Sequence, residues 1–139
     1  MPVRVLGEKK AKVSAAMVRE AAGAALSFLS REGSGMAVVF VDDKKIGRLN
    51  KVYRGKSGPT DILSFASGDD DDLGDIFISP ASAVRKAEKR SMPYRDYLKL
   101  LIVHGTLHLA GFDHHEPAAA TLMEKKEKAI IRKLHVELQ

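Results

Sequence analysis

The sequence predicts a single α+β domain, and three observations support that class. The chain has 139 residues, a length that suits one domain of ordinary size. Residues 36–41 form a continuous apolar run rich in β-branched side chains, which favours a buried strand. Residues 14–30 and 94–109 instead carry apolar side chains at helical spacing. We find no internal repeat, linker or second domain, so residues 1–139 are treated as one unit.

The first half of the chain is expected to contain two strands and two helices. Ser14 is a suitable N-cap for the first helix, and Asp42 or Asp43 can cap the second. The elements expected in chain order are a strand at residues 3–6, a charged connection at 8–12, a helix at 14–30, a buried central strand at 36–41 and a short helix from 42 to about 53.

The second half is expected to contain two more strands and three helices. Ser79 can cap the first of these helices, because Pro80 follows it at a position that helix starts favour. The helix at 94–109 is the most apolar at its centre, so we expect it to be the core helix. The elements expected in chain order are a loop leading into an apolar strand over residues 53–65, a solvated turn at 66–72, a strand at 73–79, and helices from 80 to about 90, from 94 to 109 and from 117 to about 136.

Three of the five histidines lie within residues 104–114. His104 and His108 are four residues apart, a spacing that puts both imidazoles on one face of a helix. Two such nitrogens can reach one cation at about 2.0–2.1 Å, the usual zinc–imidazole distance. Gly111 is placed to end the helix in a left-handed conformation, so that the chain can turn and bring His114 to the same cation. Three imidazoles would leave one tetrahedral position open to water, as in catalytic zinc sites.

Two other interpretations of these histidines stay open. A histidine on an apolar helix face is often a hydrogen-bonded core residue. A closed structural site is the second alternative, with Asp113, His115 or Glu116 as the fourth ligand, although His115 is expected to be exposed rather than ligating. The chain has no cysteine, which excludes the common thiolate-based structural zinc sites.

Composition indicates a soluble protein whose positive net charge is compatible with binding a polyanion such as RNA. The sequence is 45% hydrophobic and 29% charged, and its net charge is +5. It has no apolar run near the roughly 20 residues that span a bilayer and no secretory leader pattern, so a cytoplasmic location is expected. The negative charges of residues 69–72 would repel RNA, so the RNA-binding surface is not expected to extend over this part of the chain. Two basic groups are either solvated helix faces or RNA contacts: Arg85, Lys86, Lys89, Arg90 and Arg95, and Lys125, Lys126, Lys128, Arg132 and Lys133.

Two motifs resemble those of the YbeY family, metal-dependent endoribonucleases tied to bacterial ribosomal RNA maturation. Residues 104–114, HGTLHLAGFDH, match the family signature H-G-x-L-H-L-x-G-x-D-H. Residues 49–65 look like its second signature, L-N-x-x-Y-R-x-K-x-x-P-T-D-V-L-S-F, with Ile62 in place of the valine. The first motif differs from the zinc-peptidase pattern H-E-x-x-H, because Gly105 stands where those enzymes carry their glutamate base.

The resemblance implies a small mixed sheet of about four strands packed by helices, with a central helix that carries His104 and His108. It implies one Zn²⁺ per chain, or another divalent metal, held by His104, His108 and His114. It also implies catalytic roles for Arg54 and His104. Arg54 would contact phosphate through its planar guanidinium. Asp113 would support a histidine or act as a base.

By the same resemblance, the function is single-strand-specific endoribonuclease activity in ribosomal RNA processing, including 16S rRNA 3′ end maturation, and in ribosome quality control. The implied partners are ribosomal RNA precursor and the small ribosomal subunit, with no membrane and no nucleotide cofactor. Two alternatives stay open. One is a metallohydrolase of another substrate, and the other is a non-catalytic ribosome- or RNA-binding factor that is stabilised by its metal.

Overall fold

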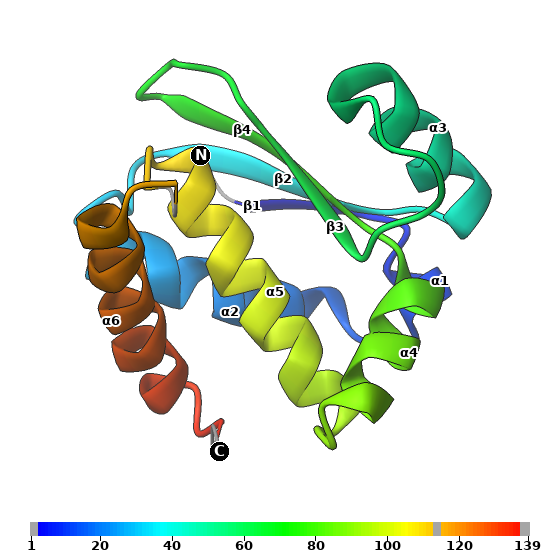
Figure 1. Ribbon diagram of the computed structural model, residues 1–139. Coiled ribbons are helices and arrows are strands. Elements are labelled where there is room, and N and C mark those ends of the chain that lie inside the picture. Colours follow the sequence, from blue (N-terminus) through cyan, green and yellow to red (C-terminus); the bar gives the residue numbers. More distant parts are fainter. Residues whose placement is uncertain (1–2, 113–114, 137–139) are drawn as a thin grey trace.

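The sheet has four strands in the order β1-β2-β4-β3 (Figure 1). The structure is a computed structural model that describes residues 3–112 and 115–136. Strand β2 is parallel to both β1 and β4, and β3 pairs with β4 in the antiparallel sense. The predicted mixed sheet of about four strands is therefore confirmed. The strands are β1 (Val3–Leu6), β2 (Gly35–Phe40), β3 (Ile62–Ala66) and β4 (Asp72–Ile78).

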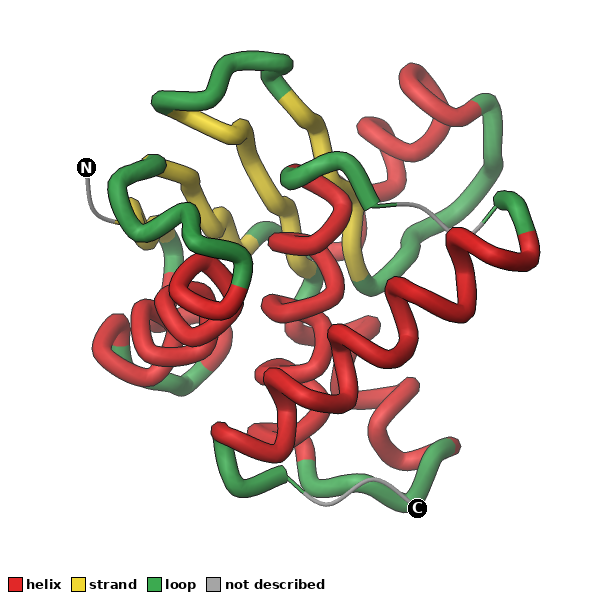
Figure 2. Tube along the Cα trace, turned by 90° about the vertical axis from the view of Figure 1, so that its left-hand side faces the viewer, coloured by secondary structure: helices red, strands yellow, loops and turns green. Residues whose placement is uncertain are grey.

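The helices divide unequally between the two faces of this sheet. Figures 1 and 2 show α2, α5 and α6 together on one side, where most of the buried apolar side chains gather. A smaller cluster of Val41, Ile46 and Leu63 lies under α3 on the other side. Across residues 3–112 and 115–136, no helix is long and apolar enough to span a membrane. The helices are α1 (Glu8–Ala11), α2 (Ala15–Phe28), α3 (Asp43–Arg54), α4 (Pro80–Lys89), α5 (Tyr94–Leu109) and α6 (Pro117–Lys133).

Three predicted helix caps are confirmed. The side chains of Ser14, Asp42 and Ser79 each accept a hydrogen bond from the backbone N–H three residues later, at 3.1, 2.8 and 3.3 Å. Each cap satisfies one of the N–H groups that a helix start leaves without a partner. These local bonds fix where α2, α3 and α4 begin, and through α3 they fix the position of Arg54 at its end.

Two sequence-based boundaries were wrong. Residues 8–12 were expected only as a charged connection, but residues 8–11 form the single helical turn α1, because Ala11 is buried in the core and Gly7 turns the chain with a positive φ. Helix α6 ends at Lys133, before the expected end near Val136, since His135 takes a left-handed conformation.

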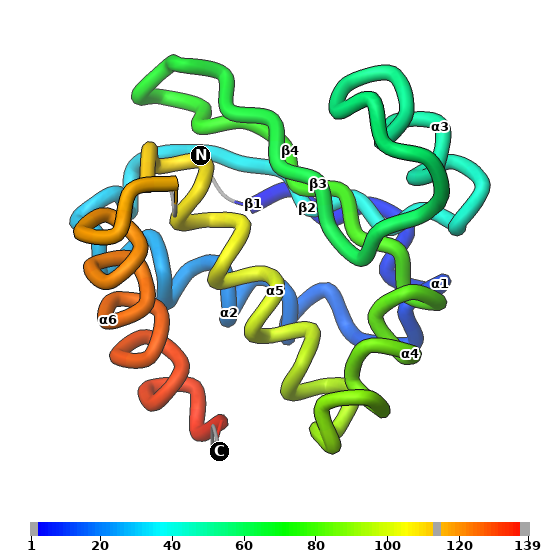
Figure 3. The backbone as a smooth tube through the Cα atoms, viewed as in Figure 1, coloured from blue at the N-terminus to red at the C-terminus, as the bar shows by residue number. Residues whose placement is uncertain are grey.

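Helix α5 is the core helix that the sequence predicts, with the same bounds. It lies between α4 and α6 under the sheet (Figure 3). Ten of its sixteen residues are buried, whereas His104 and His108 are only partly covered. The helix therefore holds two imidazoles at the surface on a rigid, packed backbone.

Candidate active site

A cleft of about 600 Å³ opens where α3, β3 and α5 meet. We call it the histidine cleft. It brings together three of the residues that the sequence predicts for the site, Arg54, His104 and His108, from two helices far apart in sequence. His115 is exposed, as expected, but it also lines this cleft. The lining residues are Tyr53, Arg54, Thr60, Asp61, Ile62, Leu63, Ser64, Phe65, His104, His108 and His115.

Gly105 lets α5 approach the floor of the histidine cleft closely. A Cβ atom at this position would lie 2.6 Å from Cδ1 of Ile76 and 3.0 Å from Cδ1 of Ile62. Ile76 belongs to β4 and Ile62 to β3, so any larger side chain would push the helix away from the sheet. The glycine thus sets the depth at which its neighbour His104 sits.

The two helix histidines converge on one point. Their Nε2 atoms are 3.2 Å apart, and their rings meet edge to face with centroids 4.7 Å apart. Two nitrogens bound to one tetrahedral zinc at 2.0–2.1 Å would be separated by about 3.3 Å. The donor pair therefore fits a divalent cation without rearrangement of α5.

Glu127 of α6 fixes the orientation of the His104 ring through the ring nitrogen Nδ1, whereas Nε2 is the atom next to His108. Its Oε2 lies 2.7 Å from Nδ1 of His104. A carboxylate oxygen only accepts, so Nδ1–H is the donor, and this bond orients the ring with Nε2 towards His108. Metal-binding histidines commonly have such a carboxylate partner.

Sequence reasoning assigned this supporting role to Asp113 and did not find Glu127. The signal was present in the spacing of α6, where Met123, Glu127 and Ile131 recur every four residues. Met123 and Ile131 are buried, so Glu127 is a carboxylate on the packing face. An acidic side chain on an apolar stripe needs a partner, and here the partner is His104.

The third expected ligand, His114, and the expected supporting residue, Asp113, lie outside the described residues. Within residues 3–112 and 115–136, no three His, Cys, Asp or Glu side chains form a cluster able to hold a metal ion. The three-histidine set stays a prediction that is based on sequence, with two of its members brought together in the structure.

Arg54 is the last residue of α3 and is exposed at the cleft. The chain leaves the helix through Gly55, whose φ is +66°. Buried Asn50 then ties down the loop that follows, because its Nδ2 donates to the carbonyl of Gly58 at 2.9 Å. No carboxylate of the described residues lies within 4.0 Å of the Arg54 guanidinium, which can therefore contact an anion in the cleft.

Asp61 is anchored at the wall of the cleft by Tyr97 of α5. The Tyr97 hydroxyl donates to Oδ2 of Asp61 at 2.5 Å, and the Ser79 N–H donates to the Asp61 carbonyl at 3.0 Å. Burial and this hydrogen bond to Asp61 raise the pKa of Tyr97 well above its usual range. Asp61 therefore joins the start of β3 to α5 and to the start of α4.

Comparison with known proteins gives a consistent result. The family model described as "Endoribonuclease YbeY" matches residues 6–135. Proteins named Endoribonuclease YbeY from Syntrophus aciditrophicus and Geobacter sulfurreducens are 34% and 36% identical. These matches cover 92% and 88% of this chain, and 86% and 88% of the relatives. The solution structure of TM1509 from Thermotoga maritima is similar, with a TM-score of 0.69 and 27% identity over 94% of this chain and 87% of that one.

Proposed function

This chain belongs to the YbeY family of endoribonucleases, and from that premise we propose that it hydrolyses phosphodiester bonds of single-stranded RNA in the histidine cleft. The proposed substrate is ribosomal RNA precursor in the cytoplasm, with maturation of the 16S rRNA 3′ end and ribosome quality control as the processes served. The small ribosomal subunit is the proposed partner. The convergence of His104 and His108 beside Arg54 is the observation that carries the proposal.

The proposed cofactor is one Zn²⁺ or another divalent ion, held by His104, His108 and His114. The 3.2 Å separation of the first two Nε2 atoms supports this choice. When bound, such an ion supplies Lewis-acid stabilisation of a phosphoryl oxygen and lowers the pKa of a water molecule. Glu127 keeps His104 in the tautomer that presents Nε2 to the cleft.

Arg54 has a separate role in this scheme. Its guanidinium can hold two oxygens of one phosphate and offset the negative charge that develops during cleavage. Because Arg54 comes from α3 and the histidines from α5, the scissile phosphate would lie between the two helices. The general base is unassigned, with Asp113 as a candidate. The nucleophile is either water or the RNA 2′-hydroxyl, and the second of these would leave a cyclic phosphate rather than a hydrolysed end.

The peptidase alternative is disfavoured by packing. A glutamate base at position 105, as in H-E-x-x-H enzymes, has no room, because even a Cβ would lie 2.6 Å from Ile76. A non-catalytic factor stabilised by its metal is the remaining alternative, and it predicts that Arg54 can be replaced without loss of function.

The test compares metal content and RNA cleavage in three variants. Elemental mass spectrometry should find stoichiometric metal in the parent and a large loss in His108→Ala. Arg54→Ala should stay folded and keep its metal, but cleave single-stranded RNA about 100-fold more slowly or worse. Arg48→Ala is the matched control, since Arg48 is also exposed on α3 but does not line the cleft, and it should cleave normally. Normal cleavage by Arg54→Ala would remove Arg54 from the mechanism.

A further inference from the structure

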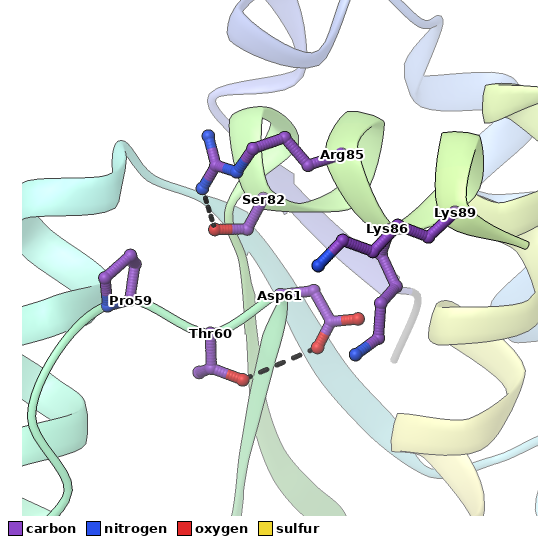
Figure 4. A pocket seen from close by; sticks show the side chains of 7 residues that line it. All are labelled: Pro59, Thr60, Asp61, Ser82, Arg85, Lys86 and Lys89. Carbon is purple, nitrogen blue, oxygen red and sulfur yellow. Dashed lines mark hydrogen bonds between the residues drawn. The ribbon is translucent and has the colours of Figure 1, made fainter.

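A second pocket, of about 260 Å³, adjoins the histidine cleft along α4. The two share Thr60 and Asp61 in their linings, so they are neighbouring parts of one surface. Figure 4 shows Lys86 and Lys89 extending from α4 towards the segment that carries these two residues. We call it the α4 pocket, and its lining residues are Pro59, Thr60, Asp61, Ser82, Arg85, Lys86 and Lys89.

Three of the seven lining side chains are exposed cations. The guanidinium of Arg85 is already fixed, 2.8 Å from Oδ2 of Asp43 and 2.9 Å from Oγ of Ser82. Lys86 and Lys89 differ from it, because no acidic oxygen of the described residues lies within 4.0 Å of either ammonium group. Two ammonium groups one helical turn apart can therefore bind an anion from solution.

Asp61 is the one carboxylate among the described residues that line the pocket, and protein hydrogen bonds hold it. Tyr97 donates to its Oδ2 at 2.5 Å, and Oγ1 of Thr60 lies 3.5 Å from its Oδ1. Its charge lowers the positive potential of the pocket but does not reverse it, because two lysines face this one carboxylate once Arg85 is paired with Asp43.

We propose that the α4 pocket binds a phosphate group of the single-stranded RNA whose scissile phosphate lies in the histidine cleft. This inference rests on the proposed function, which supplies the strand. Ammonium groups bind phosphate oxygens without reading the bases, so the pocket would position the strand and not select its sequence. Arg90, at the end of α4, is not among the residues that line the pocket, and its guanidinium lies over the Tyr97 ring at 5.6 Å.

The test measures RNA binding without cleavage. Fluorescence anisotropy of a labelled, unstructured RNA is recorded in EDTA over a range of salt concentrations. We expect Lys86→Ala/Lys89→Ala to weaken binding about fivefold to tenfold. Because the double variant no longer neutralises one phosphate of the single strand, the slope of log Kd against log salt should also fall by about 0.7.

Arg132→Ala/Lys133→Ala is the matched control, because it removes the same charge from the last turns of α6, on the other side of α5 from α4 (Figure 3). It should change the affinity less than twofold at about 0.15 M salt, where the Debye length is about 8 Å. Equal losses of RNA affinity in both double variants would overturn the proposal that the α4 pocket binds phosphate, because the loss would then reflect only the general change in net charge. Parent-like affinity and slope in Lys86→Ala/Lys89→Ala would overturn it as well.

Two further arms separate the possible outcomes. The affinities for RNA with a 5′-hydroxyl and for RNA with a 5′-phosphate are compared. If Lys86→Ala/Lys89→Ala weakens binding of both RNAs, the ligand of the pocket is an internal phosphodiester. An effect on the phosphorylated RNA alone would identify a terminal phosphate as the ligand. Cleavage is measured separately with metal. If the parent cleaves no RNA, the proposed function fails. The anisotropy measurements in EDTA still show whether the α4 pocket binds RNA phosphate, because they do not depend on cleavage.

Discussion

Replacing Gly105 by alanine should destabilise the protein, although alanine is the better helix former. Within a helix the exchange favours folding by about 0.8–1.0 kcal/mol. Here the new Cβ would lie 2.6 Å from Cδ1 of Ile76 and 3.0 Å from Cδ1 of Ile62, and such overpacking costs about 1–3 kcal/mol. The net loss is therefore about 0–2 kcal/mol. Urea denaturation followed by circular dichroism measures it directly.

Gly23→Ala is the matched control. Gly23 lies in α2, and a Cβ there would meet no atom within 4 Å, so the substitution should stabilise by about 0.5–1 kcal/mol. For a chain of this size, each kcal/mol corresponds to about 3–5 °C in Tm. A second check is Ile76→Val, which removes the nearest atom and should cost less in the Gly105→Ala background, with a coupling of about 1 kcal/mol. Equal stabilisation by Gly105→Ala and Gly23→Ala would refute the close approach of α5 to the sheet.

Two further predictions concern carboxylates. Glu127→Gln should weaken zinc affinity at the proposed site about 10- to 100-fold, measured by chelator competition, because the neutral amide is a weaker acceptor than the carboxylate and can also turn its NH2 group towards Nδ1 of His104. Glu124→Gln, an exposed position on the same helix, should bind zinc like the parent. Burial raises the pKa of Asp43, but hydrogen bonds from Ser79, Ser82 and Arg85 outweigh this and hold it below its usual value. The stability that Asp43 adds is therefore present above about pH 4 and lost as pH falls through its folded pKa. In Asp43→Asn, the urea midpoint of unfolding should fall less steeply than in the parent as the pH is lowered from 6 to 2. The same pH dependence in both proteins would contradict this account.

Local features of the site could be predicted from the sequence, and tertiary ones could not. The helix that carries His104 and His108 was predicted with its observed bounds, because four-residue spacing and apolar periodicity are properties of a single helix. Glu127 was missed because its bond to His104 joins two helices whose packing no local pattern encodes. Asp113 was assigned the role instead, since it is close in sequence.

The same distinction applies elsewhere in the chain. The hydrogen bond between Tyr97 and Asp61 spans 36 residues and depends on how β3 meets α5. The helical turn α1 was not predicted, because its charged sequence contains only one buried residue, Ala11, and a single apolar position gives no periodicity. The family signatures named Arg54, but only the structure places it on α3 with its guanidinium in the histidine cleft.

The bond between His104 and Glu127 sets an order of assembly during translation. Their 23-residue separation takes on the order of one to five seconds to synthesise. A chain synthesised only as far as α5 contains Arg54 and both α5 histidines, yet it lacks the carboxylate that orients His104. Without that carboxylate, no hydrogen bond from Nδ1 to Glu127 selects the tautomer of the ring. A newly made chain therefore acquires the carboxylate that orients His104 only when α6 docks, after the other described residues of the cleft have been synthesised.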